Sequence, residues 1–179
     1  MTARADPPLR FSVIVASRSR PTWLRRCLSG LRQLDYPEFE IILVADPESL
    51  VGIDTPNIKT VPYDTANLAA ARNIGIAHAA GDLCAFIDDD AVPEPLWLRH
   101  LADAFHATSS AAVVGFVRGR NGISYQSELS SVDDEAETHE ETVEGDIPTV
   151  PVLGKRRAVK FVGTHMAVRL ETLVRVGGF

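Results

Sequence analysis

Three consecutive carboxylates, Asp88-Asp89-Asp90, are the strongest chemical feature of this 179-residue chain. They directly follow the wholly apolar segment 83–87, which is typical of a buried strand in a parallel sheet. Adjacent acids repel one another, so a cation is a natural compensator. Mg²⁺ and Mn²⁺ prefer carboxylate oxygens and commonly bridge to substrate phosphates. We therefore predict a divalent-metal site here; the alternative is an acidic loop that caps the next helix.

Side-chain alternation refines this prediction. In an extended chain Asp88 and Asp90 would lie on one side and Asp89 on the other, so Asp90 and Asp88 are the candidate metal ligands. Arg72 belongs to a helix predicted over 67–80. Alone it is most simply a surface residue, but beside the triplet it could pair with an aspartate or reach toward a phosphate.

Polar residues also follow two earlier apolar runs. Ser17 and Arg18 come after the run 11–16, and Asp46 comes after the run 40–45. In open α/β sheets ligands bind outside the carboxyl ends of the strands. These residues are therefore candidate ligand contacts, and Asp46 could accept hydrogen bonds from a base or a ribose. The plainer interpretation of Asp46 is a turn residue before a proline.

The elements that must position these residues alternate along the chain. Short apolar runs predict buried strands, and helical spacing of apolar residues predicts the helices between them. The expected strands are 11–16, 40–45, 57–62, 83–87 and 111–117; the expected helices run from a Ser19 cap through Pro21 to Leu34, over 67–80 with Gly81 just after it, over 93–106 and over 170–176. This order implies a mostly parallel α/β sheet with right-handed crossovers.

Composition limits the remaining possibilities. The net charge of −6 and a single short basic run at 155–157 argue against nucleic acid as a partner. No apolar run reaches the length of a membrane span, and residues 1–10 lack the apolar core of a signal peptide. A cytoplasmic location is the default expectation. Cys27 and Cys84 are interpreted as small buried hydrophobes rather than a disulfide pair.

Residues 119–158 break the alternation. No Lys or Arg lies between Arg120 and Lys155, whereas eight acidic residues gather between Asp133 and Asp146. This composition favours a solvated, mobile acidic loop insert. The alternative is a lid or a flap on the acceptor side of a site. Regular structure is expected again from Val159.

Several segments together resemble family 2 glycosyltransferases. The resemblance is carried by 11–21, 40–46, 69–75 and 81–90, and it extends to 93–98, 163–169 and 176–179. It implies a GT-A fold: a Rossmann-like, three-layer α/β sandwich with a mostly parallel sheet. Residues 1–179 would form one domain, with 11–118 as the nucleotide-sugar-binding half and 159–179 as the start of the acceptor-side half.

The same resemblance implies a function. A nucleoside-diphosphate sugar would donate its sugar to an acceptor hydroxyl, with inversion and with Mg²⁺ or Mn²⁺ as cofactor. Asp46 would contact the base, and Arg72 would face the base or an acidic neighbour. Asp88 and Asp89 would lie near the ribose and the sugar, and Asp90, within an Asp-x-Asp pattern, would bind the metal. The acceptor stays open, as does peripheral association with a membrane.

This chain departs from the family pattern at several positions. Arg18 stands where an aromatic residue often covers the base, and a guanidinium can also stack on a base. Ser19 replaces the usual Asn, and Ala45 precedes Asp46 where paired aspartates are common. His165 stands where Asn is common, and we expect a structural or acceptor-wall role for it rather than a metal contact.

The largest departure concerns the general base. In the family a Glu-Asp pair after the Gly-Gly-Phe segment usually supplies it, but this sequence ends at Phe179. We therefore expect a truncated chain that binds donor and transfers weakly, or a nucleotide-sugar-binding fragment without transfer activity. A nucleotidyltransferase is a distant alternative, because 16–21 lacks a glycine-rich phosphate loop. An aspartyl-phosphate hydrolase would need a lysine and further acids at later strand ends.

Overall fold

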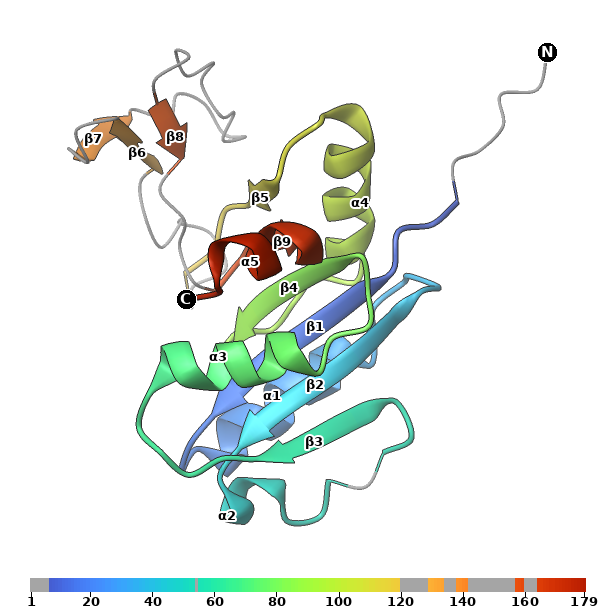
Figure 1. Cartoon of the computed structure of the whole chain (residues 1–179). Helices are drawn as coiled ribbons and strands as arrows, with labels where there is room; N and C mark the ends of the chain where they lie inside the picture. The colour runs from blue at the N-terminus through green and yellow to red at the C-terminus, as the bar shows by residue number, and fades with distance from the viewer. Residues whose placement is uncertain (1–6, 54, 120–128, 134–137, 142–156, 160–163) are drawn as a thin grey trace. The chain divides into compact units, whose positions relative to one another are not determined.

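A computed structural model describes residues 7–53, 55–119, 129–133, 138–141, 157–159 and 164–179 (Figure 1). The chain divides into two compact units. The first unit consists of Met1–Val113 and Ala167–Phe179, and the second unit consists of Val114–Met166. In the described part of the chain, no helix is both long enough and apolar enough to cross a membrane.

A six-stranded sheet has the order β3-β2-β1-β4-β9-β5. Its strands are β1 (Phe11–Ser17), β2 (Phe39–Ala45), β3 (Ile58–Pro62), β4 (Leu83–Asp88), β5 (Ala112–Val114) and β9 (Met166–Arg169). Strands β1 to β4 pair in parallel, with Ser17 opposite Ala45 and Ala16 opposite Asp88. The carboxyl ends of these strands therefore share one edge of the sheet, as Figure 1 shows.

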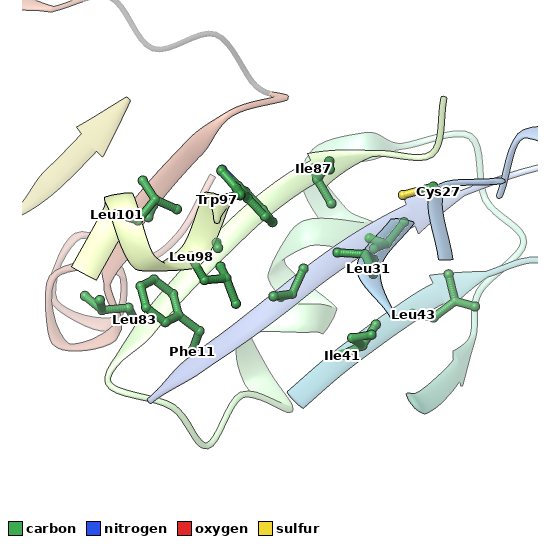
Figure 2. Close-up of a cluster of buried hydrophobic side chains, with 14 of the residues drawn as sticks. Phe11, Cys27, Leu31, Ile41, Leu43, Leu83, Ile87, Trp97, Leu98 and Leu101 are labelled. Carbon is green, nitrogen blue, oxygen red and sulfur yellow. The ribbon is translucent and has the colours of Figure 1, made fainter. Parts of the chain in front are cut away.

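Helices cover both faces of this sheet. The described residues form the helices α1 (Pro21–Leu31), α2 (Pro47–Leu50), α3 (Leu68–Ala77), α4 (Trp97–Ala107) and α5 (Leu170–Val176), of which α1 and α4 pack on one face and α3 on the other. Phe11, Val13 and Val15 of β1 join a buried cluster with apolar residues of α1 and α4 (Figure 2). Between them in sequence, Ile14 lies against Gly75 of α3 on the opposite face. This alternation produces three layers, and it confirms the predicted three-layer α/β arrangement.

Two helix boundaries differ from the sequence prediction. Helix α1 begins at Pro21 after Arg20, and Ser19 does not cap it; instead Ser19 has a left-handed backbone, with φ of 57°. The backbone N–H of Ser19 donates a hydrogen bond to Asp46, so Ser19 binds the residue after β2 instead of capping α1. Helix α3 ends at Ala77, so Gly81 does not terminate it. A Cβ at Gly81 would collide with the backbone at Phe11, so close chain packing accounts for this glycine.

Three further boundaries also differ. Helix α4 begins at Trp97 rather than at Pro93, and the strand expected over 111–117 is limited to Ala112–Val114. Helix α2 was missed because it has only four residues, too few for a helical period to be visible. Leu34 lies beyond the end of α1 at Leu31, although it still packs against the core.

The second unit contains an antiparallel three-stranded sheet of order β7-β6-β8. Its strands are β6 (Leu129–Asp133), β7 (Thr138–Glu141) and β8 (Arg157–Val159). The prediction of a loop across 119–158 is therefore wrong at these residues. These strands could not be predicted from the acidic composition, because antiparallel pairing uses backbone groups and tolerates polar side chains. The rest of the predicted loop lies outside the described residues.

Candidate functional site

The carboxyl edge of the sheet brings the predicted polar residues together. Ser17 is the last residue of β1, Asp46 follows β2, and Asp88 is the last residue of β4. The parallel register between these strands sets the three positions at one edge. The prediction that polar residues gather where the strands end is thus confirmed in its geometry.

Asp89 is the buried member of the aspartate triplet, with 4% of its surface exposed. Its carboxylate accepts a hydrogen bond of 2.6 Å from the Ser17 hydroxyl and one of 2.9 Å from Arg20. Burial raises the pKa of Asp89, and the Ser17 and Arg20 contacts only partly oppose this effect. A buried carboxylate that keeps two donors is thus held in one orientation.

Arg20 also binds the third aspartate. One guanidinium nitrogen lies 2.9 Å from Asp89 Oδ1, and the other lies 2.9 Å from Asp90 Oδ2. The expectation that Asp89 and Asp90 lie on opposite sides is therefore wrong, whereas a shared side for Asp88 and Asp90 stays a prediction. Asp89 and Asp90 lie in a turn after β4, where two-residue alternation no longer applies, and they share one cation.

Asp88 has a different arginine partner. Arg72 Nη2 of α3 lies 3.3 Å from Asp88 Oδ1. The Arg72 guanidinium carbon also lies 5.9 Å from the ring centroid of Phe86 and 5.4 Å from that of Phe179. These distances are within the range of cation–π attraction. The predicted pairing of Arg72 with an aspartate is thus present in the structure.

Asp46 is buried, and both of its carboxylate oxygens accept hydrogen bonds from nearby protein groups. Its Oδ1 accepts bonds of 2.7 Å from the Ser19 backbone N–H and 2.7 Å from the Ser49 hydroxyl, and its Oδ2 accepts from the Ser49 backbone N–H at 3.2 Å. Burial acts to raise the pKa of Asp46, but these hydrogen bonds outweigh it and the pKa is lowered. Asp46 therefore caps α2 and holds the segment after β1; its contact with a base stays a prediction.

Arg18 forms an ion pair with Asp64 rather than with an aspartate of the triplet. Its Nε is 3.2 Å from Asp64 Oδ1, and both side chains are about half exposed or more, at 49% and 63%. An exposed cation at this edge is available for stacking. The role of Arg18 in covering a base stays a prediction.

The two cysteines are buried, as expected, and neither forms a disulfide. Burial raises the pKa of Cys27 to about 12, and the nearby charge of Asp89 adds to that effect. Burial likewise raises the pKa of Cys84 to about 12. Both thiols are therefore protonated at neutral pH and pack as apolar groups.

The donor groups can be compared with what a divalent metal requires. Among the described residues, no group of three or more His, Cys, Asp or Glu side chains is arranged to hold an ion. Mg²⁺, however, is commonly bound by one or two carboxylates together with substrate phosphates. Asp88 and Asp90 suit that arrangement, since their side chains are 42% and 32% exposed. The donor set fits a metal shared with a phosphate ligand and does not fit an all-protein cage.

His165 belongs to the second unit. Its ring nitrogen Nδ1 lies 3.1 Å from the main-chain oxygen of Phe116, and its main-chain oxygen accepts a hydrogen bond of 3.2 Å from Gly115. A Cβ at Gly115 would overlap the imidazole ring. These contacts support the structural role expected for His165, and its acceptor-wall role stays a prediction.

The sequence assigned no individual role to four residues of the site, Arg20, Asn73, Phe86 and Phe179, although Arg20 lay in the strand-end range 16–20 and Asn73 beside Arg72. Arg20 stands three residues after β1, and the strand-end rule includes it in the candidate range 16–20 without naming its partner. The contact of Asn73 with Phe179 joins positions 106 residues apart. No local pattern could have revealed that pairing.

The layered sheet and the acidic strand end define the class of this protein as an open α/β fold with a candidate ligand site at the carboxyl edge of its parallel strands. Residues 12–169 match the family model of Glycosyl transferase family 2. The chain belongs to this enzyme family. The resemblance of its motifs to family 2 is therefore confirmed.

Curated relatives agree with this family. The pre-mycofactocin glycosyltransferase of Mycobacterium tuberculosis is 27% identical over 168 residues, which cover 85% of this chain and 34% of the relative. The succinoglycan biosynthesis protein ExoM of Rhizobium meliloti is 33% identical over 113 residues, covering 63% of this chain and 30% of the relative. The chain thus spans about a third of the length of these relatives.

Solved structures confirm the fold. The mannosyltransferase PcManGT of Pyrobaculum calidifontis, in complex with GDP-Man and Mn²⁺, has a TM-score of 0.68 and 20% identity over 97% of this chain and 48% of its own. S. aureus TarS 1-349, in complex with UDP, has a TM-score of 0.66 and 20% identity over 94% of this chain and 49% of its own. At this identity the likeness establishes the GT-A fold alone.

Proposed function

We propose that this protein binds a nucleoside-diphosphate sugar together with Mg²⁺ or Mn²⁺ and transfers the sugar, with inversion, to an acceptor hydroxyl. One observation carries the proposal: three successive carboxylates at the carboxyl end of β4 are interleaved with the cations Arg20 and Arg72. Acidic groups that hold a metal and cations that face phosphate are what a diphosphate leaving group needs. The metal- and donor-bound PcManGT supports the same assignment.

Each residue has a distinct part in this proposal. Asp90 and Asp88 hold the metal, which as a Lewis acid offsets charge on the departing diphosphate. Arg72 and Arg20 lie beside these carboxylates and face the diphosphate. Asp89 orients Arg20 and lies near the sugar or ribose.

The base and ribose would occupy the part of the edge after β1 and β2. Ser17 and Asp46 form its buried floor, with 8% and 4% of their surfaces exposed. Arg18 is the exposed cation above them and stacks on the base. A cytoplasmic site of action and the organisation of residues 1–179 as one domain are part of the same proposal.

A binding screen tests the donor and the metal together. UDP-, GDP- and TDP-sugars are titrated by calorimetry with and without Mn²⁺. We expect one of them to bind only with metal, and Asp90→Asn to abolish the metal dependence. Asp35→Asn is the matched control, because Asp35 also pairs with an arginine, Arg99 at 3.0 Å, but stands after α1 and outside the strand edge. Equal metal-dependent binding by Asp90→Asn and the parent would reject the metal assignment.

Transfer itself needs a product assay. Protein that binds a donor is incubated with lipid, saccharide, protein and small-molecule acceptors, and the product is analysed by NMR. The coupling constant of the anomeric proton in the product reports whether the configuration is inverted. Donor binding without any product across all acceptors would favour a donor-binding role instead.

A further inference from the structure

The segment Gly177-Gly178-Phe179 docks onto α3 at the level of Arg72. The Asn73 side chain makes two hydrogen bonds to one residue: its Nδ2 donates to the main-chain oxygen of Phe179 at 3.0 Å, and its Oδ1 accepts from the Phe179 N–H at 2.9 Å. An amide that engages both backbone groups of one residue fixes that residue in position and in direction. The contact therefore places the Phe179 ring.

The Phe179 ring then completes an enclosure around Arg72. It packs edge-on against Phe86, with ring centroids 5.2 Å apart and an interplanar angle of 83°. The Arg72 guanidinium lies within 6 Å of both centroids, at 5.9 and 5.4 Å. Phe86 is fully buried in β4, whereas Phe179 is 47% exposed. One wall of the enclosure is thus part of the sheet, and the other depends on the docked segment.

The two glycines permit this docking for different reasons. Both have left-handed backbones, with φ of +87° at Gly177 and +85° at Gly178. A Cβ at Gly178 would collide with the Asn73 amide oxygen, whereas a Cβ at Gly177 would meet open space. Only Gly178 therefore combines the backbone requirement with the close approach to Asn73.

We propose that Asn73 and Phe179 are positioning residues, which hold Arg72 against Asp88 in the donor site. Arg72 has a long side chain with several rotatable bonds, and its contact with Asp88 is 3.3 Å long. The two aromatic rings therefore limit the positions that the Arg72 guanidinium can adopt beside the carboxylate. The inference rests on the proposed function for its effect on donor binding, but not for its effect on the Arg72 side chain.

The first test observes the Arg72 side chain without any ligand. The Nε–Hε signal of Arg72 in a nitrogen–proton NMR spectrum is shifted by ring currents from Phe86 and Phe179. Asn73→Ala keeps both rings and removes the two hydrogen bonds to Phe179, so it is expected to move this signal toward the range of exposed arginines. Arg169 is the internal control, because its guanidinium lies over a different ring, Phe105 at 5.1 Å, and its signal should stay in place. An unmoved Arg72 signal overturns the proposal.

The second test compares two alanine variants by the same signal and by the thermal unfolding midpoint. Gly178→Ala and Gly177→Ala carry the same backbone cost of a side chain at positive φ. Only Gly178→Ala displaces Asn73, so only it should move the Arg72 signal. If both variants move the signal equally at equal loss of thermal stability, the effect is a general loosening of α5 and the proposal fails.

The third test asks whether Phe179 acts through Arg72 in binding. Dissociation constants of UDP and GDP with Mn²⁺ are measured for the parent, Phe179→Leu, Arg72→Met and the double variant. Losing one cation–π partner corresponds to an affinity loss of about two- to fivefold. In the Arg72→Met background Phe179→Leu should cause no further loss. The same fold-loss in both backgrounds overturns the proposal. If the parent binds neither nucleotide, the proposed function fails, and the Arg72 signal alone decides the positioning role.

Discussion

The two arginines of the site are fixed in opposite ways. The side chain of Arg20 is 46% exposed, yet the side chain of its partner Asp89 is only 5% exposed. Arg72 is 12% exposed, whereas its partner Asp88 is 42% exposed. On the Arg20 side the anion is fixed and the cation is open to water. On the Arg72 side the cation is fixed and the anion is open to water.

This difference in which partner is exposed determines how easily each ion pair can open, more than the contact distances do. The Arg20 contacts are shorter, at 2.9 Å, than the Arg72 contact at 3.3 Å. Water nonetheless screens a half-exposed pair strongly, so Arg20 can leave Asp90 at little cost. The enclosed Arg72 must stay, while Asp88 can accept a new ligand. We infer that the site offers one exchangeable cation and one exchangeable anion to an incoming metal and diphosphate.

The largest effect should come from removing the buried anion. Asp89→Ala leaves the Ser17 hydroxyl, itself 8% exposed, without its acceptor, and it removes one of the carboxylates that Arg20 binds. The expected loss is about 2–3 kcal/mol in the free energy of unfolding, as for a buried hydrogen bond to a charged group. Asp88→Ala should cost less than about 1 kcal/mol, because that pair is largely screened. Urea denaturation measures both; equal losses would remove the distinction between the two sides.

A second effect tests what holds the segment that carries Arg20. Asp46 accepts the Ser19 N–H and caps α2, so Asp46→Ala should cost about 1–2 kcal/mol at about pH 7. The folded protein lowers the pKa of Asp46 below its ordinary value of 3.8. A lowered pKa contributes stability above the unfolded value, and this contribution disappears as the pH falls through the folded value.

Urea denaturation at a series of pH values measures this dependence. The stability difference between the parent and Asp46→Ala should be largest near neutral pH and shrink as the pH falls below 3.8. Glu48→Ala, which removes an exposed carboxylate from the same short helix, is the control for the loss of a carboxylate there. A difference that grows in acid would show that the hydrogen bonds do not favour the ionised form of Asp46.

A third effect concerns the exchangeable cation. Arg20→Met removes a positive charge next to Asp90, so Mn²⁺ alone should bind about fivefold more tightly, as expected for one unit charge about 4 Å away in water. The gain should fall as salt increases. Arg99→Met, which removes another exposed ion-paired arginine, should leave Mn²⁺ affinity unchanged. Paramagnetic broadening of NMR signals by Mn²⁺ measures both, and weaker binding by Arg20→Met would reverse the assigned role of Arg20.

Much of this arrangement was predictable from sequence, because local patterns determine it. Apolar runs fixed four parallel strands to within one or two residues, and their ends located Ser17, Asp46 and Asp88. The rule that ligands bind at the carboxyl edge needs only the order of the strands. The core-facing alternation of β1 follows from side-chain period alone.

Long-range side-chain pairing was not predictable in the same way. The partner of Asp90 is Arg20, 70 residues earlier, and the partner of Asn73 is Phe179, 106 residues later. The alternation rule failed at Asp89 because the strand had already ended there. The prediction that Ser19 caps α1 was wrong, because its backbone is left-handed and its N–H donates to Asp46 instead. These features depend on the tertiary fold rather than on residue spacing.

The smallest effect should separate base binding from phosphate binding at Arg18. Arg18 and Asp64 form an exposed pair, so Arg18→Ala should change the free energy of unfolding by less than about 0.5 kcal/mol. If Arg18 stacks on the base, the variant should bind UDP or GDP about two- to fivefold more weakly, as for loss of one exposed stacking contact. Inorganic diphosphate with Mn²⁺ lacks a base, so its affinity should not change. Parallel calorimetric titrations measure the two ligands. Equal weakening of both would show that Arg18 acts as a general positive charge, like Arg20, and that the base is held elsewhere.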